Sequence, residues 1–578
     1  MARFDDLRTG RALQFRSLEG EIVARTHEEV LPALAEVERA TAEGRWAFGF
    51  VAYEAAAGLD HAFPRRQSQP GLPLVWFGLA DRPDDEPTGW TDLPHSSDAG
   101  SWTPEWTEEE YAGRLAAVRR AIADGETYQC NLTTRMTAGA PGDPAGLYHA
   151  LATNQRGTDN AYLDTGRFVV ASASPECFLD WTGSTLTSVP MKGTAPRGLT
   201  ADDDDASRRR LLASGKDRAE NVMIVDLVRN DLARVAEPGT VEVTDLLRCE
   251  RYSTVWQLTS TVSGRVGPET TLPDVFRAMF PAGSVTGAPK ARTMELIDRL
   301  EPTPRGVYCG AVGYVAPPGP ATRARFNVAI RTVVVDRTDG TATYGVGGGV
   351  TWDSTAAGEY QEILAKTRVL VAPPEPDFAL IETFRIGAAG PAHLAEHLHR
   401  MAASAEYFAF RFDRADIAAQ VRHAAQGVER DCLARVRLTR DGGVSVSTRD
   451  QGPDAAGPVL LALDTEPIDP SSRFMYHKTT VRHVYEQARR RHPEADDVLL
   501  VSLHGRVTET TVANLAAHID GVWVTPPVRD GCLPGVGRGL LLDQGVLTER
   551  SLTVADVLEA DGLALVSSAR GWRPALLE

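Results

Sequence analysis

The stretch Val-Ala-Pro-Pro-Glu-Pro-Asp at residues 371–377 divides the 578-residue chain into two parts. Three prolines in seven residues can continue neither a helix nor a central strand, because proline lacks the amide hydrogen and fixes φ. Residues 359–367 before it have a helical pattern, and the run that starts at Phe378 resembles a strand. We therefore predict a first domain at residues 1–370, a linker at 371–377 and a second domain at 378–578.

Both parts mix helical and strand-like patterns, which predicts an α+β protein. The first part should be a large domain of strand-rich layers with helices, and the second a smaller α/β domain. We predict helices at residues 111–123, 220–235, 391–408 and 481–491, and strands at 168–179, 307–315, 326–335, 341–352, 433–439 and 459–463.

Composition excludes several classes of function. The formal net charge of −17 argues against a nucleic-acid-binding surface, which needs clustered basic residues. The six cysteines form no CxxC pair, so we expect free thiols. The N-terminal residues lack the apolar core of a signal peptide, and no apolar run approaches the roughly 20 residues of a membrane helix. We expect a cytoplasmic protein without nucleic-acid or membrane partners.

Lysine is rare in this chain. Lysine and arginine together number 61, but only five of them are lysine, at positions 192, 216, 290, 366 and 478. A lysine amine can lose its proton and bond to carbon, whereas a guanidinium cannot. We therefore expect some of these lysines to perform chemistry, and one or two to be incidental. A different charged run, Asp202 to Asp205 followed by Arg208 to Arg210, predicts a solvated loop that opens a helix.

A first group of candidate residues surrounds Lys192, which lies in a turn punctuated by Pro190 and Gly193. Glu176 lies sixteen residues upstream between apolar strand residues. A partly buried carboxyl keeps its proton more readily, so Glu176 is a candidate acid. The glycine-rich run at residues 345–350 offers backbone amides at close approach.

Three glutamates share helical faces with core residues: Glu220, Glu359 and Glu362. Carboxylates on an inner helix face are costly unless they are paired or bind a cation. Oxygen ligands without histidine or cysteine suit Mg²⁺ shared with an anionic substrate. Ion pairs, such as Glu362 with Lys366, are the alternative.

Six ordered segments resemble the chorismate-binding enzymes over about residues 100 to 368. They are Ser-Pro-Glu-Cys-Phe (174–178), Pro-Met-Lys-Gly-Thr (190–194), the run at 220–231, Phe-Pro-Ala-Gly-Ser-Val-Thr-Gly-Ala-Pro-Lys (280–290), Val-Ala-Ile-Arg-Thr (328–332), and the glycine motif at 347–354 with the helix at 359–366. Members that form anthranilate, isochorismate or salicylate carry alanine before Gly193–Thr194. Lys192 instead resembles the lysine of the aminodeoxychorismate synthase component I branch.

The resemblance implies roles for the residues that match. Lys192 would attack C2 of chorismate while Glu176 protonates the departing C4 hydroxyl, and ammonia would then add at C4. Glu220 and Glu362, supported by Glu359, would bind Mg²⁺. The substrate carboxylates would be held by Thr286, Tyr308, Arg331, Lys366 and the amides of Gly347, Gly348 and Gly349. Two positions depart from the family: Gln257 replaces a usual histidine, and Ala282 a usual glycine.

A second group of candidate residues lies beyond the proline-rich stretch. Lys478 is the only lysine after residue 366, Glu509 follows it, and residues 525–538 form a glycine-rich turn before an apolar run. These segments resemble the fold-type-IV pyridoxal-phosphate enzymes, and among them the aminodeoxychorismate lyases. By that resemblance Lys478 binds the cofactor covalently and Glu509 pairs its pyridinium nitrogen. The cofactor phosphate would contact Arg400, Ser568 and the amides of Val536 and Gly537.

One feature of that family is missing, namely the strand and loop that usually precede Glu382–Thr383. Part of the active-site wall must therefore come from elsewhere or be absent. Together the two resemblances imply a bifunctional enzyme that makes 4-aminobenzoate from chorismate with Mg²⁺ and pyridoxal 5'-phosphate. A separate glutamine amidotransferase would supply ammonia, and the second domain could form a homodimer. The alternatives are a second domain that is a transaminase or non-catalytic, and an anthranilate synthase.

Overall fold

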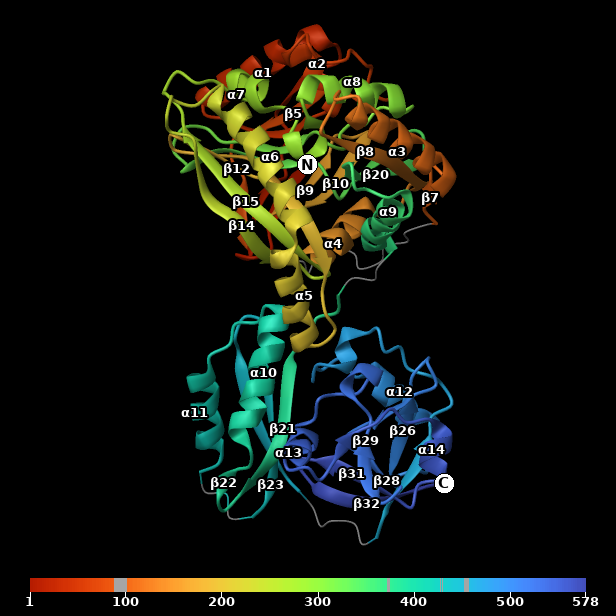
Figure 1. Ribbon diagram of the computed structural model, residues 1–578. Helices are drawn as coiled ribbons and strands as arrows, with labels where there is room; N and C mark the ends of the chain where they lie inside the picture. The colour runs from red at the N-terminus through yellow and green to blue at the C-terminus, as the bar shows by residue number, and fades with distance from the viewer. Residues whose placement is uncertain (88–100, 372–374, 427, 429, 452–456) are drawn as a thin grey trace. The chain divides into compact units, whose positions relative to one another are not determined.

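The computed structural model describes residues 1–87, 101–371, 375–426, 428, 430–451 and 457–578, which form two compact units (Figure 1). The first unit comprises Met1–Pro196 and Arg208–Glu375, and the second comprises Arg197–Ser207 and Pro376–Glu578. Residues 372–374 of the predicted linker lie outside the described residues. The prediction assigned residues 197–207 to the first domain, whereas these residues pack with the second unit.

Two ten-stranded sheets form the first unit. The first sheet has the order β16 (Gly287–Ala288), β8 (Gln129–Gly139), β20 (Thr341–Val350), β19 (Thr332–Asp336), β10 (Phe168–Ser174), β9 (Asp159–Asp164), β1 (Ala2–Asp6), β2 (Arg11–Phe15) and β6 (Asp84–Pro87), with β7 (Thr103–Pro104) paired to β8. The second has the order β13 (Met191–Pro196), β15 (Val255–Arg265), β12 (Thr185–Val189), β11 (Cys177–Thr182), β18 (Thr322–Val328), β17 (Ala311–Val315), β4 (Trp46–Val51), β5 (Val75–Ala80) and β3 (Gly20–Ala24), with β14 (Glu242–Arg251) paired to β15.

The buried side chains show four layers in this unit. An aromatic-rich core lies between the two sheets, where Phe15 of one sheet stacks on Phe48 of the other with ring centroids 4.7 Å apart. A second core lies between one sheet and α1 (His27–Ala42), α2 (Ala56–Leu59), α6 (Gly215–Ala233) and α7 (Leu272–Met279). A third lies between the other sheet and α3 (Glu108–Ala123), α4 (Pro144–Gln155), α8 (Lys290–Leu300) and α9 (Ala356–Val371).

The chain crosses from one sheet to the other at two places that the sequence predicted as continuous strands. Residues 168–179 form β10 of one sheet and β11 of the other, and the break contains Pro175 and Glu176. Residues 326–335 form β18 and β19, and Arg331 between them has a left-handed φ of 51°. The crossings are hydrogen-bonded together, since the Val328 amide donates to the Glu176 carbonyl and the Ala173 amide to the Arg331 carbonyl. The two breaks therefore bring two predicted site residues, Glu176 and Arg331, to the same junction between the sheets.

Two sheets also form the second unit. The smaller has the order β22 (Gly390–Pro391), β21 (Leu380–Gly387), β23 (Cys432–Leu438) and β24 (Val444–Asp450), and it packs against α10 (Leu394–Phe408) and α11 (Arg414–Ala424). The larger has the order β27 (Val507–Thr510), β26 (Asp497–Val501), β25 (Val459–Leu463), β32 (Gly571–Leu577), β31 (Gly562–Ser567), β28 (Asn514–Ile519), β29 (Val522–Thr525) and β30 (Thr548–Glu549). An additional pair, Glu509 with Asn514, joins β27 to β28 and closes part of this sheet into a ring.

The remaining helices are α12 (His483–Arg491), α13 (Val536–Asp543), α14 (Val554–Leu558) and α5 (Ala201–Ala213), whose first residues belong to the second unit and whose last belong to the first. The mixture of sheets and helices confirms the expected α+β class. Among the described residues, we find no helix with the length and apolar character needed to cross a bilayer.

Candidate active sites in the two units

The glycine-rich strand β20 forms one wall of a cavity in the first unit, and glycine is required there by close approach. A β-carbon at Gly345 would lie 2.1 Å from the Tyr308 ring, and one at Gly348 would lie 2.8 Å from a Glu359 oxygen. At Gly349 it would lie 2.2 Å from the Gln129 amide nitrogen and 2.9 Å from Lys192 Nζ. Any larger residue would therefore fill the space that the site side chains occupy.

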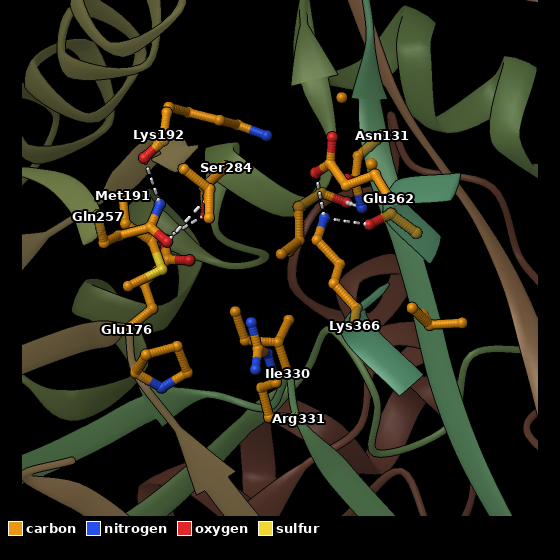
Figure 2. Close-up of a pocket in the computed structure, with 18 of the residues that line it drawn as sticks. Asn131, Glu176, Met191, Lys192, Gln257, Ser284, Ile330, Arg331, Glu362 and Lys366 are labelled. Atoms are coloured by element: carbon orange, nitrogen blue, oxygen red, sulfur yellow. Dashed lines mark hydrogen bonds and ion pairs between the residues drawn. The ribbon is translucent and has the colours of Figure 1, made fainter. Parts of the chain in front are cut away.

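Lys192 and Glu176 line this same cavity (Figure 2). Burial lowers the pKa of Lys192, and nearby Lys366 lowers it further against the opposing effect of Glu220, Glu176 and Glu362. Burial raises the pKa of Glu176 to about 7, although hydrogen bonds from Ser284 Oγ and the Met191 amide oppose the rise. The cavity thus holds an amine that gives up its proton more easily than usual and a carboxyl that retains its proton near neutral pH.

Gln257 holds the strand that carries Lys192. Its amide nitrogen donates to the Gly193 carbonyl at 2.9 Å, and its oxygen accepts from Thr194 Oγ1 at 3.0 Å. Gln257 and Thr194 are also register partners of β15 and β13. This position, where the family usually has histidine, therefore fixes the backbone on the C-terminal side of Lys192.

The three glutamates predicted to bind Mg²⁺ all line the cavity. Glu359 accepts from Ser354 Oγ at 2.7 Å, and its pKa is raised by burial and by Glu362. Burial also raises the pKa of Glu220, whose carboxylate lies 3.8 Å from Lys216 Nζ. Glu362 pairs with Lys366 Nζ at 2.7 Å, as the alternative prediction stated. No group of three or more His, Cys, Asp or Glu side chains within the described part of the chain has the geometry of a metal site.

The residues predicted to hold the substrate carboxylates are brought together with one exception. Arg331, Tyr308, Lys366 and the three glycines of β20 line the cavity, and Lys366 Nζ also donates to the Gly347 carbonyl at 2.8 Å. Arg331 donates to Gln155 at 3.1 Å. Thr286 does not line the cavity, because its buried hydroxyl donates to the carbonyls of Ala282 and Gly283.

Sequence reasoning missed several residues that line the cavity, notably Asn131, Ser284 and Lys216. Ser284 lies inside the motif at residues 280–290, but nothing in that motif marks it as a partner of Glu176. Lys216 had a usable signal, since three of the five lysines line this one cavity. Lys290 fits the expectation that one or two lysines have no chemical role, because it does not line this cavity and its amine pairs with buried Asp231 at 2.7 Å.

In the second unit, Lys478 follows buried His477 and precedes α12. Burial, and after it the positive charge of Arg400, lower the pKa of Lys478 to about 8, although Glu382 and Glu509 oppose the shift. The Lys478 carbonyl accepts from the Ile381 amide at 2.9 Å, which ties this segment to β21. Lys478 therefore combines a readily lost proton with a fixed backbone.

Glu509 lies at the register pair that closes the larger sheet. Tyr485 donates to Oε1 at 2.8 Å, and the Asn514 side chain donates to Oε2 at 3.2 Å. Burial raises the pKa of Glu509 to about 7, although hydrogen bonds from Tyr485 and from the Leu533 amide oppose the rise. Both carboxylate oxygens are thus held by neutral donors.

The residues predicted for the cofactor phosphate also gather. Arg400 makes a bidentate ion pair with Glu382 at 2.8 and 2.6 Å and donates to the Pro534 carbonyl at 3.0 Å, just ahead of α13. A β-carbon on Gly537 would lie 2.7 Å from the Ser568 amide nitrogen, so α13 begins against that residue. Ser568 Oγ lies 2.8 Å from His397 Nε2. Arg400, Ser568, Val536 and Gly537 therefore surround the start of one helix, where backbone amides favour an anion.

Comparison with known proteins connects the two units with two families. Residues 3–372 match the chorismate binding enzymes, and residues 379–577 match the class IV amino-transferases. These matches confirm the resemblance of the first part to the chorismate-binding enzymes, and that of the second part at the level of the class IV amino-transferases. An anthranilate synthase component I from Streptococcus pneumoniae TIGR4 shares 26% sequence identity with a TM-score of 0.54, covering 64% of this chain and 92% of its own.

Two relatives show which enzymes are similar in sequence. An aminodeoxychorismate synthase from Streptomyces pristinaespiralis is 47% identical over 45% of this chain and 36% of its own length. An anthranilate synthase component 1 from Haloarcula marismortui is 42% identical over 48% of this chain and 56% of its own. The chain thus spans only 36% of the length of the first relative and 56% of the length of the second. Because the match to the chorismate binding enzymes extends over more than half of the chain, the protein belongs to that family.

Proposed function

We propose that this protein makes 4-aminobenzoate from chorismate in two steps. The first unit replaces the C4 hydroxyl of chorismate by an amino group, and the second eliminates pyruvate from the resulting 4-amino-4-deoxychorismate. The observation that supports the proposal most strongly is the presence of Lys192 and Glu176 in one cavity, since the anthranilate-forming branch of the family carries alanine at the lysine position.

The first step needs a neutral amine and an acid. Lys192 Nζ would attack C2 of the ring, and the double bonds would shift so that the C4–O bond breaks. Glu176 would give its proton to the departing hydroxyl, which leaves as water. Ammonia would then bond to C4, the double bonds would shift back, and the C2–N bond to Lys192 would break. The added nitrogen would return one proton to Glu176. Overall, an amino group from ammonia replaces the hydroxyl, one water is released, and Lys192 and Glu176 are both regenerated.

The carboxylates of the cavity fit a Mg²⁺ ion shared with the substrate. Mg²⁺ keeps several waters and commonly takes only one or two protein carboxylates together with an anionic substrate. Glu220 and Glu359 would hold it, because burial raises both pKa values and a bound cation would relieve that cost. Glu362 would contribute once it exchanges its ion pair with Lys366. The ion would neutralise a substrate carboxylate and orient the ring.

The remaining cavity residues would hold the substrate in place. Arg331 is directed into the cavity from its left-handed position between β18 and β19, and Lys366 lies on the wall formed by α9. Each supplies a positive charge for one carboxylate of chorismate. The amides of Gly347, Gly348 and Gly349 would add donors at close approach.

The second unit fits pyridoxal 5'-phosphate. Lys478 has a depressed pKa, buried Glu509 is held in one orientation, and three of the five N–H donors of Arg400 are used by Glu382 and Pro534. Lys478 would hold the cofactor, Glu509 would face its ring nitrogen, and Arg400, Ser568 and the amides of Val536 and Gly537 would hold its phosphate. When bound, the cofactor stabilises an electron pair released at the substrate carbon. Lys478 would take the C4 proton, and loss of pyruvate would leave the aromatic ring.

Ammonia would come from a separate glutamine amidotransferase. This is the partner that the resemblance to aminodeoxychorismate synthase component I implies. The first unit itself should accept free ammonia, since Lys192, Glu176 and the carboxylates all lie within it. Ammonium salts should therefore replace the partner in a test with the purified chain.

One incubation tests the proposal. Purified protein is mixed with chorismate, Mg²⁺, ammonium and pyridoxal phosphate, and the products are identified by mass spectrometry. We expect 4-aminobenzoate and pyruvate in equal amounts. Accumulated aminodeoxychorismate would contradict the second activity, and anthranilate would contradict both the first activity and the role given to Lys192. A chelator should stop the first step and excess Mg²⁺ should restore it.

A further inference from the structure

The second unit contains eleven residues from the first half of the chain. We call Arg197–Ser207 the strap. The strap follows directly after β13, the strand of Lys192, and the chain rejoins the first unit at Arg208.

The strap is held by a buried arginine. Arg197 and Asp204 form a bidentate ion pair at 2.6 and 2.7 Å, and their side chains are only 5% and 7% exposed. Asp204 belongs to the acidic run predicted to be solvated, and that prediction is wrong for this residue because Arg197 covers it. Arg197 also donates to the Tyr407 carbonyl at 2.9 Å and lies over the Tyr407 ring at 4.3 Å. The strap is thus packed against the end of α10.

Tyr407 connects the strap to the residue beside Lys478. Its hydroxyl donates to the Gly198 carbonyl at 2.8 Å, and its ring lies 4.3 Å from the ring of His477. His477 is buried, and its Nδ1 lies 2.9 Å from Ser404 Oγ. Burial lowers the pKa of His477 to about 3, so the imidazole is neutral and packs as an uncharged ring.

One face of α10 carries both the strap contacts and the predicted cofactor contacts. Arg400, Ser404 and Tyr407 are spaced at i, i+4 and i+7, which places them on the same side of the helix. Arg400 contacts Glu382 and Pro534, Ser404 contacts His477, and Tyr407 contacts the strap. A shift of α10 would therefore move Arg400 and the segment of Lys478 together.

We propose that the strap positions the second active site by fixing α10 and His477, and through them Arg400 and Lys478. Arg197, Tyr407 and His477 are then positioning residues, and none of them acts on the substrate. The inference rests on the proposed function only for the identity of the cofactor and of the reaction. It makes the second site dependent on a segment that continues from the Lys192 strand.

A matched pair of full-chain variants tests this inference. Arg197→Met removes the arginine from buried Asp204. Arg491→Met removes an arginine with the same bidentate geometry, 2.9 and 2.7 Å, from buried Asp464 elsewhere in the second unit. Both substitutions remove a bidentate arginine contact from a buried aspartate, so both should lower the thermal midpoint. Only Arg197→Met should disturb Lys478 and Arg400.

Two measurements separate positioning from stability. The first is the rate at which an amine reagent labels Lys478 in cofactor-free protein as a function of pH, followed by peptide mass spectrometry. In Arg197→Met, we expect the pH at which labelling is half-maximal to rise towards the value for an ordinary lysine. In Arg491→Met, we expect this pH to remain unchanged. The second is pyruvate release from supplied aminodeoxychorismate, which should fall about a hundredfold in Arg197→Met, since a displacement of 1 Å costs that much. Arg197→Lys should restore part of the rate.

Tyr407→Phe provides a milder variant if Arg197→Met does not fold. It removes the hydrogen bond to Gly198 and the one that Arg473 makes with the same hydroxyl, and it should shift both measurements in the same direction by less. If Arg197→Met folds and matches Arg491→Met in labelling and in pyruvate release, the inference is wrong. If the wild-type protein releases no pyruvate, the proposed reaction is wrong. A labelling shift confined to the strap variants would still support the inference that the strap positions Lys478.

Discussion

The two units place a lysine beside carboxylates in different ways. In the first unit, burial and Lys366 lower the pKa of Lys192, and Glu176 beside it has a pKa of about 7. In the second unit, burial and Arg400 lower the pKa of Lys478, and Glu509 also has a pKa of about 7. The cause of the raised acid pKa, burial, is the same in both.

What differs is how each acid is held. Glu509 accepts from Tyr485 of α12 at one oxygen and from Asn514 of β28 at the other. Glu176 lies at a crossing between two sheets and lines a cavity together with Lys192. Glu176 is therefore suited to exchange a proton with a small molecule, whereas Glu509 is suited to face one cofactor atom throughout. The same pKa can thus serve two tasks, depending on what surrounds the carboxyl.

Replacing Lys192 should have the largest effect. Lys192→Ala removes the proposed nucleophile, and we expect aminodeoxychorismate formation to fall by at least about 10³-fold. Supplied aminodeoxychorismate should still be converted to pyruvate at the wild-type rate, because the second unit is intact. Product analysis by mass spectrometry with each substrate checks both statements. Retention of full amination activity would show that Lys192 is not the nucleophile.

The reciprocal variant, Lys478→Ala, should separate the activities in the opposite sense. Amination of chorismate should continue and aminodeoxychorismate should accumulate, while pyruvate release falls by about 10²-fold or more. The visible absorbance of lysine-bound cofactor should also disappear. If pyruvate release survives in this variant, the second unit does not use Lys478 as its base.

Glu176→Gln tests whether Glu176 is the acid that gives its proton to the substrate. A general acid contributes about 10² to 10⁴-fold, so we expect a loss in that range in the amination step. The pKa of about 7 means that wild-type Glu176 is protonated below pH 7 and loses its proton above it. The wild-type rate should therefore decline as pH rises through 7, and this decline should be absent from the variant. An unchanged alkaline decline would assign it to another group.

Much of this arrangement could be predicted from the sequence, because several residues of the two candidate sites carry distinctive signals. The scarcity of lysine indicated Lys192 and Lys478, and helical spacing indicated Glu220 and Glu362. The prolines at residues 371–377 indicated a division, and one boundary between the two compact units lies at Glu375 and Pro376. These signals are local, since each depends on one residue type or on a spacing within one element.

The features that could not be predicted depend on contacts between distant segments. The runs at 168–179 and 326–335 have the pattern of single strands, and only tertiary packing divides each between two sheets. Ser284 contacts Glu176 across more than a hundred residues, and the strap joins the second unit across two hundred. The acidic run at 202–205 has the composition of a solvated surface, yet Arg197 makes part of it a buried contact.

Glu509→Gln should have the smallest effect and tests the other half of the comparison. The substitution keeps the size of the side chain but removes the charge that would face the cofactor ring nitrogen. A hydrogen bond to a charged group is worth about 1.5–3 kcal/mol, so pyruvate release should fall roughly 10- to 100-fold while amination is unaffected. The folded-state pKa of about 7 lies above the ordinary value of 4.5, so ionisation of Glu509 destabilises the folded unit as pH rises between these values. Thermal midpoints of cofactor-free protein at pH 5 and pH 7.5 should therefore differ less in Glu509→Gln than in the wild type. Equal differences, or a change of less than twofold in pyruvate release, would mean that Glu509 does not have the fixed role that distinguishes it from Glu176.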